Sequence, residues 1–105
     1  GIDIDNTVDG DSSFDFDGHR VELIAVPGHT RGGMAIYIPD LKIVFSGDSL
    51  FGGAIGRTDL PGGDHRQLVE SIRNRLLTLP DDTTVLPGHM EPTTIGDERR
   101  NNPYL

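Results

Sequence analysis

The sequence contains no cysteine and no tryptophan, and only six of its residues are tyrosine or phenylalanine. Without cysteine, neither a disulfide framework nor a zinc finger can form. No apolar stretch approaches the roughly 18 residues that a membrane-spanning helix requires, and no signal-peptide pattern is present. We therefore expect a cytoplasmic protein without a membrane partner.

Positive charge is also scarce. Nine Lys and Arg stand against 17 Asp and Glu, which gives a formal net charge of −8 and argues against nucleic acid as a partner. Much of the acidic excess falls in the first 17 residues, where it favours a solvated, turn-rich surface. The segment that begins at Asp5 resembles a calcium loop, but Phe16 stands where a bidentate Glu is required, so we reject a calcium site.

The length of 105 residues is sufficient for one small domain and too short for two. Hydrophobic residues make up 34% of the chain, so its core is expected to be lean. Small domains of this kind are often completed by a metal ion or by a partner surface.

Apolar and alternating runs predict strands at residues 12–17, 21–26, 34–38, 43–45 and 84–86, with a turn at Pro39–Asp40. Six glycines and one proline between residues 47 and 63 predict a segment that is mostly loop. Strands followed by interleaved helices indicate an α/β layer, in which helices cover one face of a sheet.

Two helices are predicted after this loop. The first begins at Asp64 as N-cap, with Gln67 as its capping-box partner, and ends at Pro80. Its apolar stripe consists of Leu68, Ile72, Leu76 and Leu79, widened by Val69. The second is a polar helix that Thr94 caps and that extends through Arg100.

Three strand ends repeat one pattern, namely a short apolar strand, a glycine and then a side chain that can bind a metal ion. They are Val26-Pro27-Gly28-His29, Phe45-Ser46-Gly47-Asp48 and Leu86-Pro87-Gly88-His89. Glycine lets the backbone turn sharply, and loops at strand ends can direct side chains to a common point. Imidazole suits zinc, and a carboxylate can bridge two cations, which together polarise a carbonyl and generate hydroxide.

Taken singly, each of these residues is more often a turn former or a helix cap. Two histidines in the same Pro-Gly-His frame, with a Gly-Asp between them, favour one shared metal site. His19 and His65 lack this setting and are interpreted as surface residues. Arg57 and Asp59, in the glycine-rich loop, are interpreted as a charge pair that stabilises the loop rather than as substrate ligands.

Four motifs in order resemble those of the metallo-β-lactamase superfamily, and most of all its glyoxalase-II-like, hydroxyacylglutathione-hydrolase-related hydrolases. The motifs are Pro27-Gly28-His29-Thr30, Phe45-Ser46-Gly47-Asp48-Ser49, Gly56-Arg57-Thr58-Asp59-Leu60-Pro61-Gly62-Gly63 and Pro87-Gly88-His89. Any one Pro-Gly-His alone is a weak signal, whereas the ordered set is specific and covers nearly the whole chain from Val21 onward.

The resemblance implies an αββα sandwich that binds two metal ions, usually zinc and sometimes iron or manganese. By position, His29 is similar to the ligand of the first metal and His89 to that of the second. Asp48 is similar to the carboxylate that bridges both ions. Thr30 and Gly33 resemble the tight turn behind the first ligand.

Two departures from the superfamily are visible. Its first signature, His-x-His-x-Asp-His, is absent, so residues 1–105 resemble the C-terminal half of a domain of about twice this length without its N-terminal half. The expected fold is therefore α/β, half of an αββα sandwich with one mixed β-sheet and helices on its outer face. The second departure is Met90-Glu91 after His89, where many relatives carry a glycine.

The resulting hypothesis is a metal-dependent hydrolase of thioesters or related small carbonyl compounds, inactive as this chain alone. Its expected partners are a small-molecule substrate and either the missing half or a second copy of the chain. An iron-dependent sulfur dioxygenase remains an alternative within the same fold. The alternative from another class is a non-catalytic half-domain that folds by self-association or with a partner chain.

Overall fold

The structure, a computed structural model, describes residues 5–6 and 12–105. Three of the six early aspartates, Asp3, Asp9 and Asp11, lie outside these residues, as do residues 7–11 of the calcium-like segment. No helix in the described part of the chain is long and apolar enough to cross a membrane.

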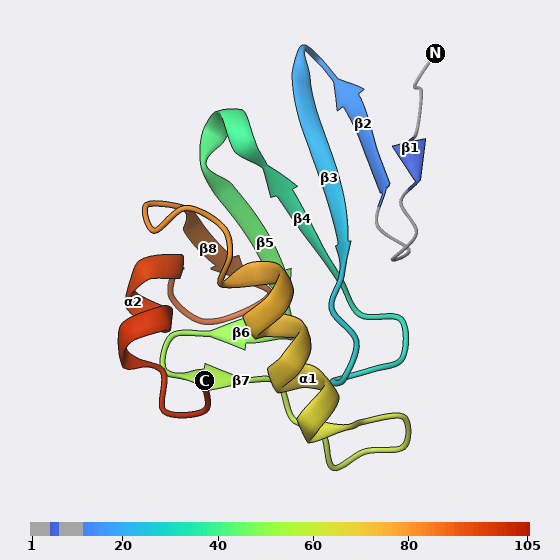
Figure 1. The fold of residues 1–105 in the computed structure, drawn as a ribbon, viewed down its shortest axis with the longest axis vertical. Helices are drawn as coiled ribbons and strands as arrows, with labels where there is room; N and C mark the ends of the chain where they lie inside the picture. Colours follow the sequence, from blue (N-terminus) through green and yellow to red (C-terminus); the bar gives the residue numbers. More distant parts are fainter. Residues whose placement is uncertain (1–4, 7–11) are drawn as a thin grey trace.

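A mixed sheet forms the body of the molecule, and it has seven strands among the described residues (Figure 1). Its spatial order is β1-β2-β3-β4-β5-β8-β9. The strands are β1 (Asp5–Asn6), β2 (Ser12–Phe16), β3 (His19–Ala25), β4 (Met34–Ile38), β5 (Ile43–Gly47), β8 (Thr84–Pro87) and β9 (Thr93–Thr94). Neighbours are antiparallel except β5 and β8, which are parallel. The expected mixed sheet is thus confirmed.

The connections refine the prediction from sequence. A single turn of 3-10 helix, η1 (Pro39–Leu41), joins β4 to β5 where a plain turn was expected. The glycine-rich segment after β5 also contains a short hairpin, β6 (Leu50–Phe51) and β7 (Ala54–Ile55), which was not predicted. Parallel strands need a long crossover connection, and this hairpin and the first helix provide it between β5 and β8.

The first helix, α1 (His65–Ser71), begins as predicted, because Asp64 accepts a hydrogen bond from the Gln67 N–H at 3.0 Å. It continues as a π-helical segment, η2 (Ile72–Leu76), whose wider turn is closed by the Leu77 N–H donating to the Ile72 carbonyl. The helical structure therefore ends at Leu76 and not at Pro80.

The second helix, α2 (Ile95–Asn101), matches its prediction. Thr94 caps it and accepts a hydrogen bond from the Asp97 N–H at 3.1 Å.

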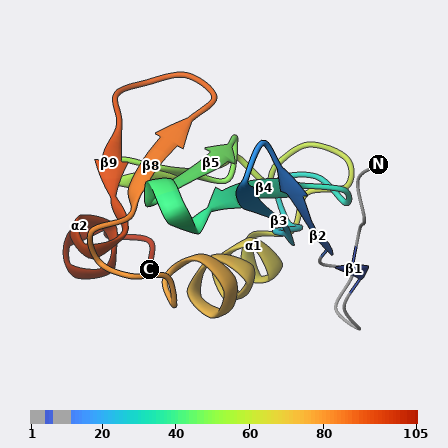
Figure 2. The same cartoon turned by 90° about the horizontal axis from the view of Figure 1, so that it is seen from above.

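Both helices lie on the same side of the sheet (Figure 2). The core lies between them and the strands, and its fully buried members include Ala35, Val44 and Val85 from the sheet and Leu68, Ile72 and Leu76 from α1 and η2. Removing such side chains from water is the main stabilising contribution to folding. This arrangement confirms the expected layer of helices on one face.

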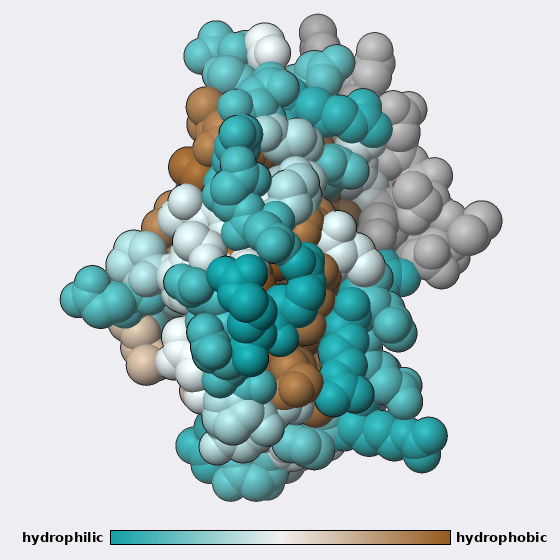
Figure 3. All heavy atoms as spheres, turned by 60° about the vertical axis from the view of Figure 1, so that its left-hand side comes forward, coloured by the Kyte–Doolittle hydropathy of each residue, from teal (hydrophilic) through white to brown (hydrophobic). Residues whose placement is uncertain are grey.

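The opposite face of the sheet carries a row of apolar side chains, and no helix among the described residues covers it. Cross-strand pairing aligns Leu23, Ile36, Phe45 and Leu86, and Met34 lies on the same face. Met34, Ile36 and Phe45 are 43%, 40% and 41% exposed. Figure 3 turns the helix-free side of the sheet to the left, and hydrophobic spheres gather along the upper part of that margin. We call this surface the bare face.

Candidate metal centre

The topology of the sheet brings three loops to one edge. β3 and β5 are each antiparallel to β4, so they run in the same direction, and β8 is parallel to β5. The C-terminal ends of β3, β5 and β8 therefore lie at the same edge (Figure 1). The three candidate ligands His29, Asp48 and His89 follow these ends.

The loop that carries His29 is held tightly at both sides. Its two ends are joined by the Val26 N–H donating to the Gly33 carbonyl at 2.8 Å, and the Gly28 N–H donates to the Thr30 carbonyl at 3.0 Å. A Cβ at Gly33 would lie 2.5 Å from the Val26 oxygen, so the turn requires glycine there. This turn is the one that the resemblance placed behind the first ligand.

The same loop is pressed against α1. Gly28 has a φ of +132°, and a Cβ at this position would lie 2.4 Å from backbone atoms of Leu68. The Asp64 N–H donates to the Gly28 carbonyl at 2.7 Å, which ties the loop to the cap of the helix. The backbone that precedes His29 is therefore fixed by the packed core.

The loops of Asp48 and His89 are joined through their backbones. The Gly88 N–H donates to the Gly47 carbonyl at 2.9 Å and thereby extends the pairing of β5 and β8. After Asp48 the chain turns back, and the Gly56 N–H donates to the Ser49 carbonyl at 2.9 Å. The loops that carry Asp48 and His89 therefore start from adjacent, hydrogen-bonded strands.

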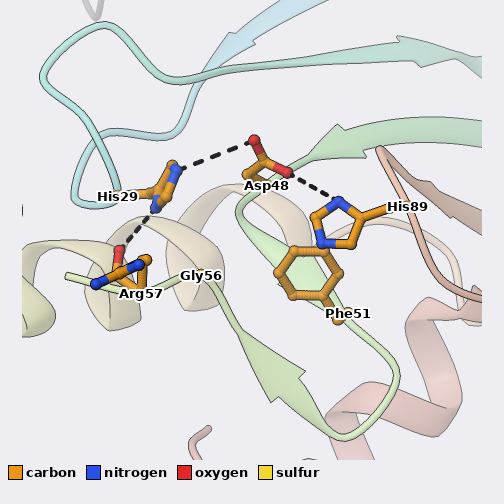
Figure 4. A pocket seen from close by; sticks show the side chains of 6 residues that line it. All are labelled: His29, Asp48, Phe51, Gly56, Arg57 and His89. Carbon is orange, nitrogen blue, oxygen red and sulfur yellow. Dashed lines mark hydrogen bonds and ion pairs between the residues drawn. The ribbon is translucent and has the colours of Figure 1, made fainter.

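The three side chains meet around the Asp48 carboxylate (Figure 4). His29 Nε2 lies 4.0 Å from Oδ2 of Asp48, and His89 Nδ1 lies 3.5 Å from Oδ1. They line a pocket of about 310 Å³ together with Phe51, Gly56 and Arg57. The sequence prediction that these three residues lie close together agrees with this geometry.

The His29 ring is oriented by a backbone contact. Its Nδ1 lies 2.7 Å from the carbonyl oxygen of Arg57. Because a carbonyl only accepts hydrogen bonds, Nδ1 is the donor in this contact, and Nε2 is the ring atom that faces Asp48. A second hydrogen bond of this kind is how proteins set the tautomer of a metal-binding histidine.

Arg57 and Asp59 form the charge pair that the sequence indicated. The Arg57 guanidinium donates from Nε and Nη2 to the two Asp59 oxygens, at 2.8 and 2.9 Å. These hydrogen bonds lower the pKa of the Asp59 carboxyl and raise the pKa of Arg57. The pair lies in the loop whose backbone carbonyl contacts His29.

Phe51 and Met90 add two features near His89. The Phe51 ring is buried, and its centroid lies 5.2 Å from that of the His89 imidazole at an interplanar angle of 47°. Sequence reasoning missed Phe51, although an aromatic residue three positions after Asp48 was visible. Met90 adopts a φ of +86°, a conformation that favours glycine.

The two other histidines lie outside the pocket, as predicted. His19 begins β3, and its Nδ1 lies 3.2 Å from Oδ2 of Asp40. His65 is the exposed first residue of α1.

Two imidazoles and a carboxylate are donors that suit zinc and iron. Within residues 5–6 and 12–105, no group of three or more His, Cys, Asp or Glu side chains is clustered closely enough to hold an ion by itself. The residues present therefore fit part of a metal site.

The fold is a mixed β-sheet with helices on one face, and two histidines and an aspartate meet at the C-terminal ends of three of its strands. This combination is typical of α/β proteins that bind metal ions at the ends of strands. Within this class, the sequence model of the Metallo-beta-lactamase superfamily matches residues 1–89, so the chain belongs to this superfamily. Membership implies binding of divalent metal ions, and it confirms the resemblance drawn from the four motifs.

Individual relatives agree with this assignment. Hydroxyacylglutathione hydrolase GloC of Haemophilus influenzae is 48% identical over 89 residues, which are 85% of this chain and 42% of that protein. The crystal structure of BLEG-1 B3 metallo-beta-lactamase has a TM-score of 0.84 at 44% identity and covers 89% of this chain and 44% of its own. TTHA1623 in a di-iron-bound form has a TM-score of 0.78 at 49% identity, covering 81% and 42%. The chain thus spans less than half the length of each.

Proposed function

We propose that this chain supplies three ligands of a two-metal hydrolase site. His29 would hold the first ion and His89 the second, and Asp48 would be shared between them. The observation that carries the proposal is that Asp48 turns one carboxylate oxygen toward each imidazole, at 4.0 and 3.5 Å. A carboxylate placed in this way has one oxygen for each of two cations.

The proposed ions are zinc, with iron or manganese as alternatives. When bound, they supply an activated water and positive charge that stabilises the oxyanion of a carbonyl under attack. The residues of the chain set the positions of the donors. The Arg57 carbonyl holds the Nδ1–H of His29, and the Phe51 ring supports the imidazole of His89.

The proposed substrates are thioesters or related small carbonyl compounds. This choice is supported by the similarity to a hydroxyacylglutathione hydrolase. The pocket volume of about 310 Å³ is at the lower end of the range for small-molecule sites. Its wall combines the apolar ring of Phe51 with the polar groups of Arg57, and the charge of Arg57 is balanced by Asp59.

The remaining ligands are proposed to come from outside residues 1–105. Zinc is mostly bound by four donors in proteins, whereas three side chains shared between two ions provide only two donors each. The chain spans 42% of the length of the Haemophilus influenzae relative. The partner that completes the site is either an N-terminal half of the same fold or a second copy of the chain, and the chain alone is inactive.

A second candidate function is that of a non-catalytic half-domain that binds metal weakly. The observation in its favour is that no group of three or more potential ligands within the described residues is clustered closely enough to hold an ion. The two candidate functions predict different metal content and different thioesterase activity once the remaining ligands are supplied.

To distinguish them, the chain is joined to the part of the Haemophilus influenzae relative that lies outside the matched region. Metal content and thioester hydrolysis are then measured. The hydrolase proposal expects about two metal ions per joined chain and turnover that Asp48→Ala abolishes. Thioesterase activity of the isolated chain, or a joined protein whose metal content does not depend on Asp48, would contradict it.

A further inference from the structure

Glu98 is a buried acidic side chain that the proposed chemistry does not use. It lies on α2 and is 4% exposed. Burying a carboxylate is unfavourable unless hydrogen-bond donors surround it. Here Oε1 accepts from the Gly53 N–H at 2.8 Å and from Asn102 Nδ2 at 3.0 Å, and Oε2 accepts from the Thr93 hydroxyl at 2.7 Å.

Two of these donors belong to segments that form the pocket wall. Gly53 lies in the turn between β6 and β7, the hairpin that carries Phe51. Thr93 begins β9, where the loop that contains His89 returns to the sheet and pairs with Val85. The Glu98 carboxylate therefore joins the hairpin and the His89 loop to one helix.

The third donor strengthens the same connection. Besides its bond to Glu98, Asn102 Nδ2 donates to the Ala54 carbonyl in β7 at 3.1 Å. The Asn102 side-chain oxygen accepts from the Tyr104 N–H at 3.0 Å. All the polar groups of this buried network are thus paired, which makes such a network rigid.

The hairpin and the loop meet where Phe51 packs against His89. The His89 side chain is 70% exposed, so its position depends on the course of its loop and on the ring contact at 5.2 Å. A shift of the hairpin relative to the loop would separate the rings and move His89 away from the Asp48 carboxylate.

We infer that Glu98 is a positioning residue for His89. Its carboxylate holds the hairpin and the loop at the separation at which Phe51 packs on the imidazole and the imidazole faces Asp48. The inference rests on the proposed function insofar as His89 is taken as a metal ligand. The position of the ring itself is measurable without any metal.

The test is a metal-free NMR spectrum of the histidine rings of the 105-residue chain, which has four histidines. Phe51→Leu shows where the His89 ring-proton shifts lie without the ring current of Phe51. Glu98→Gln keeps the size of the side chain but replaces one acceptor oxygen with an NH₂ group, which removes the negative charge and an acceptor from the network. We expect it to move the His89 signals toward their Phe51→Leu positions and to leave those of His29 unchanged.

Asp97→Asn is the matched control, because Asp97 lies beside Glu98 on the same helix but is exposed. It should leave all His89 signals in place. Thr93→Val, which removes the hydroxyl that Glu98 binds, should shift the His89 signals, whereas Thr93→Ser, which retains a hydroxyl, should restore them. This second pair tests the inference even if Glu98→Gln does not fold.

The contrary result is that the folded variants Glu98→Gln and Thr93→Val keep the His89 chemical shifts of the wild type and differ from it only by a lower Tm. This result would show that Glu98 has a merely structural role and would overturn the inference. Failure of the joined protein to bind metal through Asp48 would instead count against the proposed function. It would not alter these metal-free shifts, so the two failures are distinguishable.

Discussion

Asp48 is central among the three candidate ligands, because one imidazole faces each of its oxygens. In the proposed site, each of two ions would have one histidine and this shared carboxylate. Two donors are half of what a zinc ion commonly takes in a protein. Asp48 is therefore the one residue on which both proposed ions depend.

We expect the isolated chain to bind at most one zinc ion per monomer, and weakly, when titrated by calorimetry. Asp48→Ala should remove this binding, because each remaining histidine is then an isolated donor. His65→Ala is the control, since His65 is exposed on α1 and does not line the pocket. Two tight sites on the monomeric chain would contradict the prediction.

A second prediction concerns the charge pair beside His29. The Asp59 carboxyl has a lowered pKa, mainly because Arg57 donates hydrogen bonds to it. A carboxyl whose pKa is lowered in the folded state stabilises the fold at pH values above its ordinary, unfolded-state pKa. This contribution is lost as the pH falls through the lowered pKa. Arg57→Gln should therefore raise the pKa of Asp59, measured by carbon NMR of the carboxyl.

The matched control is Lys42→Met, which removes the partner of Asp82 at a distant exposed pair. It should raise the pKa of Asp82, which Lys42 lowers by hydrogen bonding, and leave that of Asp59 unchanged. An Asp59 midpoint that does not move in Arg57→Gln would show that the pair is not formed in solution.

The residues that sequence reasoning could and could not identify differ in a physical way. His29, Asp48 and His89 each follow an apolar strand and a glycine, a local pattern that the sequence displays. The Arg57 carbonyl that orients His29 is a backbone atom, and every residue has one, so only the course of the loop reveals its role. Glu98 has no sequence pattern that predicts its burial.

At the scale of elements, the prediction succeeded where periodicity or capping spans several residues. β4 occupies its predicted range, and the caps at Asp64 and Thr94 form as expected. The strands β6, β7 and β9 have two residues each, which is too short for an alternating pattern. The π-helical segment η2 was also missed, because apolar residues four apart fit either kind of helical turn.

The contact of α1 and η2 with the sheet leads to a prediction about stability. Ile72 is fully buried in the core between these helical segments and the sheet. Ile72→Ala should lower the free energy of unfolding by about 2–5 kcal/mol, because it removes buried methyl groups and leaves a cavity. In a domain of this size, about 1 kcal/mol lowers the Tm by roughly 4–8 °C.

The control is Arg73→Ala, since Arg73 is the exposed neighbour of Ile72 in the same segment. Its effect on the free energy of unfolding should stay within about 0.5 kcal/mol. Thermal unfolding followed by circular dichroism measures both variants. Equal losses in the two would show that this segment does not pack on the sheet in solution.

At the scale of the whole molecule, the sheet has one covered and one bare face. In the sequence, the expected strands 21–26 and 34–38 carry apolar residues on both alternating faces, and one helical stripe can cover only one of these faces. The structure shows which side remains, because cross-strand register places Ile36 beside Phe45 on the bare face. Register depends on long-range pairing, so the sequence alone did not specify this surface.

The last prediction is that the isolated chain associates through this bare face. Ile36 and Phe45, about 40% exposed, lie in a row that continues across four strands, and soluble monomers rarely tolerate large contiguous apolar patches. Burial is favourable by about 25 cal/mol per Å² of apolar surface, so a second copy of the chain or the proposed partner half should cover it. Sedimentation equilibrium at micromolar concentration should therefore show species heavier than the 11.4 kDa monomer.

The combined variant Ile36→Lys and Phe45→Glu should shift the chain to the monomer and reduce its binding of a hydrophobic dye. The two new charges are opposite and directly paired across β4 and β5, so they can attract each other and they leave the net charge at −8. The matched control, Leu41→Lys with Leu60→Glu, changes two exposed leucines that lie in η1 and in the glycine-rich loop. It should associate like the wild type. A wild-type chain that sediments as an 11.4 kDa species and binds no dye would refute the prediction, as would equal association of the wild type and the Ile36→Lys, Phe45→Glu variant.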